Sequence, residues 1–226
     1  MPLDVYLRNG RTFLAAKLFL PARANGVGVV FSHGWGGAHL FDDLHAYLAD
    51  SGVTVASMEQ RGYGQSSGKA VLAKWPEDMA AVGEWLRAQN LRAWAMGLST
   101  GGTMALVTAG KFAWFAGGLA LSPFATLKLI RRDYPPCKKV LAERFGSFRP
   151  VDYATADALT WTATVPPRPA VVVHARGDEV VPFAHAELIR DTGGATLWEF
   201  AGGDHRLQTI DRPALFGRIK EAITAA

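Results

Sequence analysis

The sequence contains one cysteine among 226 residues, so it has no intrachain disulfide and little basis for thiol redox chemistry. This thiol, Cys137, lies between a proline and two lysines, a setting that would lower its pKa if the lysines faced it. No base is placed beside it in the sequence. We therefore expect Cys137 to be a bystander, and a single thiol fits a reducing compartment.

Long apolar segments are also lacking. The first ten residues, MPLDVYLRNG, have no basic flank before an apolar run, so they do not have the pattern of a secretory signal. The longest apolar stretch, Phe112 to Leu127, is interrupted by glycines and by Ser122-Pro123, and it is shorter than the ~20 residues of a spanning helix. We expect no stable membrane insertion and a cytoplasmic location.

Acidic residues are scarce in one segment. Between Lys128 and Arg149 there are seven basic residues and two acids, so this segment carries a net charge of +5. The formal net charge of the whole chain is +4, so the remaining residues carry about −1. No base-stacking module or zinc-finger spacing accompanies the segment, so we expect no nucleic-acid partner. A solvated helical face is the simplest interpretation; an anionic part of a substrate or an anionic lipid surface is the alternative.

A complete phosphate-binding loop is missing as well. RGYGQSSGKA, residues 61–70, ends in Gly-Lys but has Tyr63 where the first glycine of such a loop would stand and Ala70 where the metal-binding hydroxyl would stand. Both departures remove atoms that the phosphate mechanism needs. The segment is instead predicted to be a glycine-rich turn, in which Ser66 and Ser67 hydrogen-bond the loop.

Hydrophobic residues make up 49% of the chain, enough for the core of a single domain over residues 1–226. A hairpin is expected first, with Asn9-Gly10 as its turn. After it, short continuous apolar runs alternate with amphipathic stretches, the pattern of a mostly parallel sheet with helices on both faces. The expected strands are 26–33, 53–58, 92–99, 114–121, 170–176 and 195–201, and the expected helices are 39–51, 75–90, 101–110, 183–190 and 212–224.

One connection is unusually long. About 40 residues, Lys128 to Pro169, separate two expected strands, whereas connections in such folds have few residues outside the helix. We expect a short lid-like insertion over the site.

The segment AMGLSTGG joins a strand directly to a helix. A serine at the centre of Gly-x-Ser-x-Gly, here Ser99, would occupy a strained turn at a helix N-terminus, where partial positive charge stabilises an oxyanion. Its hydroxyl needs a base, and the base needs an orienting carboxylate. His205 in GGDH and Asp178 in GDEVVP follow successive strands in the required chain order. Glu179, the next residue, could be the orienting carboxylate instead.

These motifs together, with FSHGWGG and RGYGQSSG, resemble the α/β hydrolases, specifically the compact serine-aminopeptidase-like and lysophospholipase-like esterases. The resemblance covers nearly the whole chain. It implies Asp178 as the triad acid, and an oxyanion hole formed by the backbone N–H groups of Trp35 and Thr100. Where many relatives have an aspartate before the Arg-Gly-x-Gly segment, this chain has Glu59-Gln60.

The resulting hypothesis is a serine hydrolase that forms an acyl-enzyme without cofactor or metal and cleaves small to medium carboxylic esters. Thioesterase or aminopeptidase activity on the same triad, or ligand binding without catalysis, are the alternatives. Dehalogenase and epoxide hydrolase activities are disfavoured, since they would need aspartate at position 99.

Other polar residues are expected to be structural. His33 is expected to hold its loop through hydrogen bonds, and Asp204 to belong to a turn. His174 is expected in the core or at its rim, and His185 to be structural or exposed. A last group could gather on one helix but lacks a known metal-binding spacing: His39, Asp42, Asp43 and His45.

Overall fold

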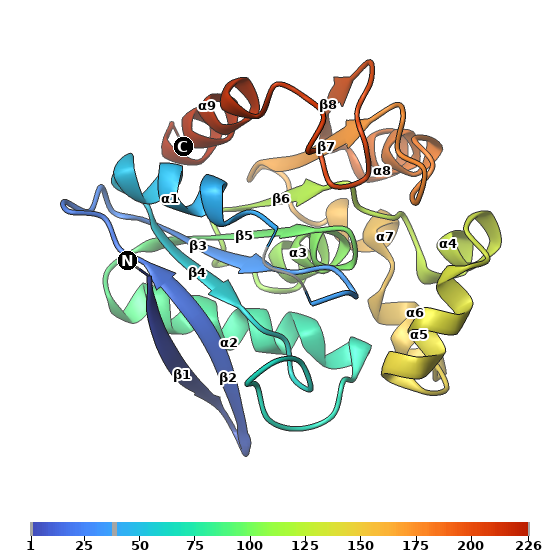
Figure 1. Cartoon of the computed structure of the whole chain (residues 1–226), viewed down its shortest axis with the longest axis horizontal. Helices are drawn as coiled ribbons and strands as arrows, with labels where there is room; N and C mark the ends of the chain where they lie inside the picture. Colours follow the sequence, from blue (N-terminus) through green and yellow to red (C-terminus); the bar gives the residue numbers. More distant parts are fainter. Residues whose placement is uncertain (1, 38–39, 226) are drawn as a thin grey trace.

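The computed structural model describes residues 2–37 and 40–225, and its centre is one eight-stranded sheet (Figure 1). The strand order is β1-β2-β4-β3-β5-β6-β7-β8. Strands β3 to β8 run parallel, while β2 is antiparallel to both β1 and β4. The strands are β1 Leu3–Asn9, β2 Thr12–Phe19, β3 Val27–Ser32, β4 Thr54–Met58, β5 Arg92–Leu98, β6 Gly117–Leu121, β7 Ala170–Ala175 and β8 Thr196–Phe200.

Helices cover both faces of the sheet. The long ones are α1 Asp42–Asp50, α2 Trp75–Ala88, α3 Thr100–Lys111, α8 Ala184–Gly193 and α9 Arg212–Thr224. Helices α2, α3 and α8 bury residues in the core on one face, whereas α1 and α9 bury theirs in a separate core on the other. Because β3, β4, β6 and β7 are buried throughout, their sequences are continuous apolar runs, as both faces of a parallel sheet require. The predicted α/β-hydrolase architecture with its N-terminal hairpin is confirmed.

Four short helices lie between β6 and β7: α4 Leu127–Asp133, α5 Cys137–Phe145, α6 Pro150–Thr155 and α7 Ala158–Thr162. Figure 1 shows α4, α5 and α6 grouped at one side of the molecule. The ring of Phe145 at the end of α5 packs 5.8 Å from that of Trp75 and 6.4 Å from that of Tyr63. Aromatic contacts therefore hold the insertion against the loop that precedes α2.

Most element boundaries lie within two residues of the sequence-based expectation, and three differ from it by three residues: the starts of β6 and α1, and the end of α8, which is at Gly193 and not at Arg190. Strand β6 begins at Gly117, not at Trp114, because Trp114 and Phe115 stack in a turn with ring centroids 4.1 Å apart. Helix α1 begins at Asp42, and His39, where the helix was expected to start, lies outside the described residues.

Within residues 2–37 and 40–225, no helix combines the length and the apolar character that crossing a membrane requires.

A buried ion pair joins three segments of the chain. Asp78 on α2 is fully buried, and its carboxylate accepts hydrogen bonds from Arg61 Nε at 2.6 Å and Arg61 Nη2 at 2.5 Å. Asn9 Nδ2, from the hairpin turn, donates to Asp78 Oδ1 at 2.8 Å. The glycine-rich loop, α2 and the hairpin are therefore fixed to one carboxylate.

Arg61→Ala is expected to destabilise the protein by on the order of 3 kcal/mol, because it leaves the buried Asp78 charge without its main partner. Urea unfolding followed by circular dichroism measures the loss. Arg176→Ala is the control, since it breaks an ion pair with Glu199 in which both side chains are about half exposed, and it should change stability little. Equal losses in the two variants would show that the Arg61 pair has no special structural role.

Candidate active site

Ser99 lies at the turn between β5 and α3, in a backbone conformation that residues other than glycine rarely adopt. Its φ is 56° and its ψ is −120°. The turn is tight because glycines allow the chain segments to touch: a Cβ at Gly101 would lie 2.2 Å from the carbonyl oxygen of Ser32, and one at Gly97 would lie 2.5 Å from the backbone of Gly101. The expected strained turn is present, and both glycines are needed for it.

Ser99 borders a cavity of about 460 Å³ at the carboxyl ends of the strands. His205 and Trp35 border the same cavity. The side chain of Ser99 is 3% exposed, and its Oγ has no hydrogen-bond partner among the described residues. Ser99 and His205 therefore share a cavity in this structure without a hydrogen bond between them.

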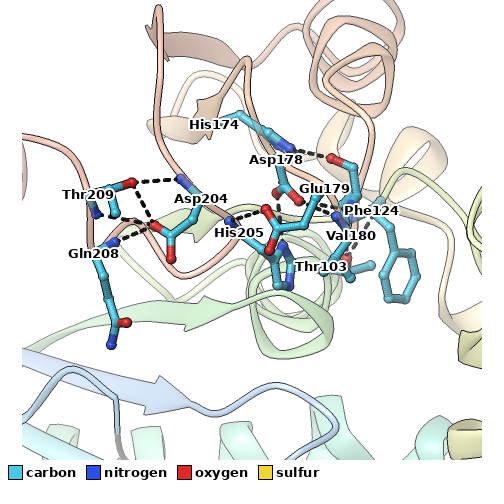
Figure 2. Close-up of polar contacts among 11 residues, drawn as sticks. Thr103, Phe124, His174, Asp178, Glu179, Val180, Asp204, His205, Gln208 and Thr209 are labelled. Carbon is cyan, nitrogen blue, oxygen red and sulfur yellow. Dashed lines mark hydrogen bonds and ion pairs between the residues drawn. The ribbon is translucent and has the colours of Figure 1, made fainter.

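Asp178 and His205 are joined directly (Figure 2). Asp178 follows β7 and His205 follows β8, and the two strands are neighbours, so their carboxyl ends bring the side chains together. His205 Nδ1 donates to Asp178 Oδ2 at 2.8 Å, which leaves Nε2 as the free ring nitrogen. The other oxygen, Oδ1, accepts the N–H groups of Val180 at 2.9 Å and Val181 at 2.8 Å.

Asp178 stays ionised despite its burial. Desolvation alone would raise the pKa of its carboxyl group, but hydrogen bonds from His174 and His205, the charge interaction with His205 and the N–H of Val181 outweigh it and hold the pKa well below its usual range. A buried carboxylate with this many donors is a fixed negative charge beside His205.

His174 is the polar neighbour that the sequence did not reveal. It was expected in the core or at its rim, and it is fully buried at the end of β7. Its Nε2 lies 3.1 Å from Asp178 Oδ2, the oxygen that also accepts from His205. The only sequence signal is its position four residues before Asp178.

The loop after β3 approaches Ser99 closely, because a Cβ on Gly34 would lie 3.2 Å from Ser99 Cβ. The His33 ring holds this loop, as expected. Its Nε2 accepts the N–H of Gln60 at 3.1 Å, so its Nδ1 carries the proton and donates to the carbonyl of Gly34 at 2.6 Å. That carbonyl belongs to the peptide group whose N–H is that of Trp35, so His33 fixes the direction of this N–H.

The glycine-rich turn at residues 61–70 supports the same loop. Tyr63 Oη donates to the carbonyl of Trp35 at 3.1 Å. Ser66 and Ser67 bond the turn to β2 through the N–H groups of Ala15 and Phe13, both at 2.8 Å. The turn thus shapes the surroundings of the cavity, which agrees with the interpretation of the sequence.

The insertion forms part of the cavity wall through Tyr134, Pro136 and Val140. Among the described residues that border the cavity, none is one of the seven basic residues between Lys128 and Arg149. Four of the seven contact the protein itself: Arg131 bonds Tyr153, Arg132 bonds Asp133, Arg144 lies over the Tyr63 ring, and Arg149 pairs with Asp152. The positive charge of residues 128–149 therefore lies outside the wall of the cavity that Ser99 borders.

The weaker candidates have structural roles. Glu179 is exposed and its Oε2 accepts the N–H of His205 at 3.3 Å, whereas Asp204 caps a turn by accepting the N–H groups of Gln208 and Thr209. His185 is buried rather than exposed; its Nδ1 accepts the N–H of Ala125 at 3.0 Å, and its Nε2 lies 3.3 Å from Asp133.

The Cys137 thiol is buried, and burial raises its pKa, contrary to the activation that its lysine neighbours would give. For the histidines and acids near α1, the described residues hold no cluster of metal-binding side chains, and His39 lies outside them. Asp43 instead pairs with Arg212 at 2.6 Å.

Solved structures share this fold along the full length of the chain. An esterase of Pyrococcus furiosus is 18% identical, with a TM-score of 0.79 over 100% of this chain and 91% of its own. The α/β hydrolase GrgF of Penicillium is 16% identical, with a TM-score of 0.80 over 100% of both chains. Est1E of Butyrivibrio proteoclasticus, solved with ferulic acid, is 18% identical, with a TM-score of 0.76 over 98% of this chain and 96% of its own.

The fold is that of the α/β hydrolases. Residues 25–163 match the family described as serine aminopeptidase, S33, and the chain belongs to that family. No curated protein matches the sequence.

Ser99→Gly is expected to be more stable than Ser99→Ala by about 1 kcal/mol, because glycine adopts a positive φ without the strain that any Cβ causes. Urea unfolding of both variants measures the difference. The control is Ala142→Gly at an exposed position of α5, where glycine should reduce stability. If Ser99→Gly were the less stable of the two Ser99 variants, the turn would not be strained.

Proposed function

We propose that the protein is a serine hydrolase in which Ser99 is the nucleophile, His205 the general base and Asp178 the orienting acid. The observation that carries the proposal is the pairing of Asp178 with His205 Nδ1 beside a cavity that Ser99 also borders. This pairing leaves Nε2 as the proton acceptor. The unbonded Ser99 hydroxyl is compatible with the role, since catalytic hydrogen bonds are often long or poorly aligned before substrate binds.

In the proposed reaction Ser99 Oγ attacks the substrate carbonyl carbon while its proton moves to His205 Nε2. The carbonyl oxygen becomes an oxyanion that accepts hydrogen bonds from the backbone N–H groups of Trp35 and Thr100. Thr100 is the first residue of α3, where backbone N–H groups lack partners within the helix. His205 then gives the proton to the leaving group, and the acyl group stays on Ser99. A water molecule then gives a proton to His205 and attacks the acyl carbon. The bond from that carbon to Ser99 Oγ breaks, His205 returns the proton to Ser99 Oγ, and the acid is released.

A carboxylic ester of small to medium size is the substrate class that we propose. The cavity of about 460 Å³ fits a small molecule, and its walls include Trp35, Leu98 and Val140. The similar structures include an esterase of Pyrococcus furiosus, and another, Est1E, has ferulic acid bound. No nucleic-acid partner, metal or cofactor enters this proposal. Thioester or amide cleavage on the same residues remains the alternative chemistry.

We further propose that the chain is a single domain whose insertion, residues 128–169, acts as the lid of the cavity. The support is that Tyr134, Pro136 and Val140 form part of the wall, while Phe145 packs on Trp75 at the start of α2 and α7 contacts α3 and α8. The basic residues of the insertion would then increase solubility or bind a partner outside the cavity, and they would not contact the reacting ester.

The decisive test is the intact mass of the protein after exposure to a fluorophosphonate, which phosphonylates activated serines. The wild type should gain one adduct, and Ser99→Ala and His205→Ala should gain none. Ser122→Ala is the matched control, because Ser122 also follows a strand, is fully buried and has a positive φ of 47°. It should keep the adduct. A folded wild type without an adduct would contradict the proposal and favour ligand binding without catalysis.

The rate of ester hydrolysis should rise with pH across the range of about 5 to 8, because a protonated imidazole cannot accept the proton of Ser99. Asp178 does not titrate in this range, since its pKa is held far below it. Initial rates with a chromogenic ester in buffers of constant ionic strength provide the measurement. A rate that does not change with pH over this range would exclude His205 as the base.

A further inference from the structure

Asp178 Oδ2 lies within hydrogen-bond distance of two histidines, and only one of them borders the cavity. His205 Nδ1 is 2.8 Å from this oxygen and His174 Nε2 is 3.1 Å from it. His174 and the Asp178 carboxylate are both fully buried, whereas the His205 side chain is 11% exposed. The proposed reaction uses His205 and leaves His174 without a role.

The partners of His174 fix which of its nitrogens carries the proton. Nε2 also lies 2.9 Å from the carbonyl oxygen of Val181, and a carbonyl can only accept, so Nε2 is the donor. Nδ1 is buried and has no partner among the described residues, which fits its unprotonated state. One N–H is therefore shared between the Val181 carbonyl and Asp178 Oδ2.

We propose that His174 is a positioning residue, which fixes Asp178 Oδ2 and takes up part of its negative charge so that His205 is not held too strongly in its protonated form. The inference rests on the proposed function. With His174 present, the four donors to the carboxylate are two backbone N–H groups on Oδ1 and two imidazole N–H groups on Oδ2. Without it, His205 is the sole side-chain donor to Oδ2 within residues 2–37 and 40–225.

The direction of the effect follows from electrostatics. A carboxylate oxygen that loses a donor attracts the remaining proton more strongly, so the imidazolium form of His205 becomes more stable. His205 would then titrate at higher pH, and less of it would be in the basic form at neutral pH. Loss of His174 should therefore move the acid limb of the pH–rate profile upward.

The other charged groups near the two histidines leave this direction unchanged. His174 faces the Phe183 ring, with centroids 5.8 Å apart, and interacts with the buried His185 of α8. Arg176 also lies over the Phe183 ring and pairs with exposed Glu199. Around His205 are Glu179, at its N–H, and two further cavity residues, Asp204 and Arg206. All of these stay in place when His174 alone is replaced.

The experiment compares H174F, which removes the donor but keeps a ring, with H174Q, whose amide nitrogen can occupy the Nε2 position and donate to both acceptors. The titration of the His205 ring is followed by NMR, and the rate of phosphonylation of Ser99 by the fluorophosphonate is measured against pH. In H174F both midpoints should rise by about half to one pH unit, with a plateau rate about tenfold lower. In H174Q both midpoints should stay near those of the wild type.

Two variants serve as controls. H185Q changes a second buried histidine that does not bond Asp178, and its midpoints should not move. H174N places its amide nitrogen at the Nδ1 position, so it also removes the donor to Asp178; it replaces H174F if thermal unfolding shows that H174F does not fold.

The outcomes separate this inference from the function on which it rests. Unmoved midpoints in H174F or H174N, or equal losses in these variants and in H174Q, would overturn the positioning role. A shifted His205 titration in a protein that takes no adduct would retain the coupling of His174 to His205 while overturning the proposed hydrolase.

Discussion

The close contact between β3, β5 and α3 is the constraint on which the site depends. Ser99 reaches the cavity only because α3 starts at the next residue, and α3 can start there only because Gly97 and Gly101 carry no Cβ where the carbonyl oxygen of Ser32 comes near. The cost is a serine at φ 56°, which the packing of the strands and the helix maintains. The same contact brings Gly34 against Ser99, so one steric requirement places both the hydroxyl and the loop after β3.

The second constraint is electrostatic and centres on Asp178. A buried carboxylate is unfavourable unless its oxygens are bonded, and here the turn after β7 supplies two N–H groups while two histidines supply the rest. Because these donors come from β7, from the turn after it and from the loop after β8, the Asp178 carboxylate also holds these three segments together. In the proposed reaction this arrangement gives His205 a fixed orientation before any substrate arrives.

Sequence reasoning recovered what chain order and strand ends determine. Asp178 and His205 could be expected to meet because they follow neighbouring parallel strands. Ser99 could be placed at a strand-to-helix turn because it is the centre of the Gly-x-Ser-x-Gly motif. His174 could not be found, since its contact depends on how the turn returns Asp178 to the strand end. The four short helices of the insertion were also beyond reach. Local contacts such as the Thr126 cap of α4, whose Oγ1 accepts the N–H of Leu129, and the Thr126–Asp157 bridge hold them, and periodicity does not reveal such contacts.

The insertion separates two properties that the sequence presents together. Its charge left recognition of an anion open as the alternative to a solvated helical face, yet Arg131, Arg132, Arg144 and Arg149 contact aromatic rings or carboxylates of the protein. What it presents to the cavity is Tyr134, Pro136 and Val140, whose contribution to binding is mainly the burial of apolar surface. If the proposed hydrolysis holds, selectivity among esters then depends on how well the acyl or alcohol group fills this wall, and the ionic strength of the medium should matter less than the shape of the substrate.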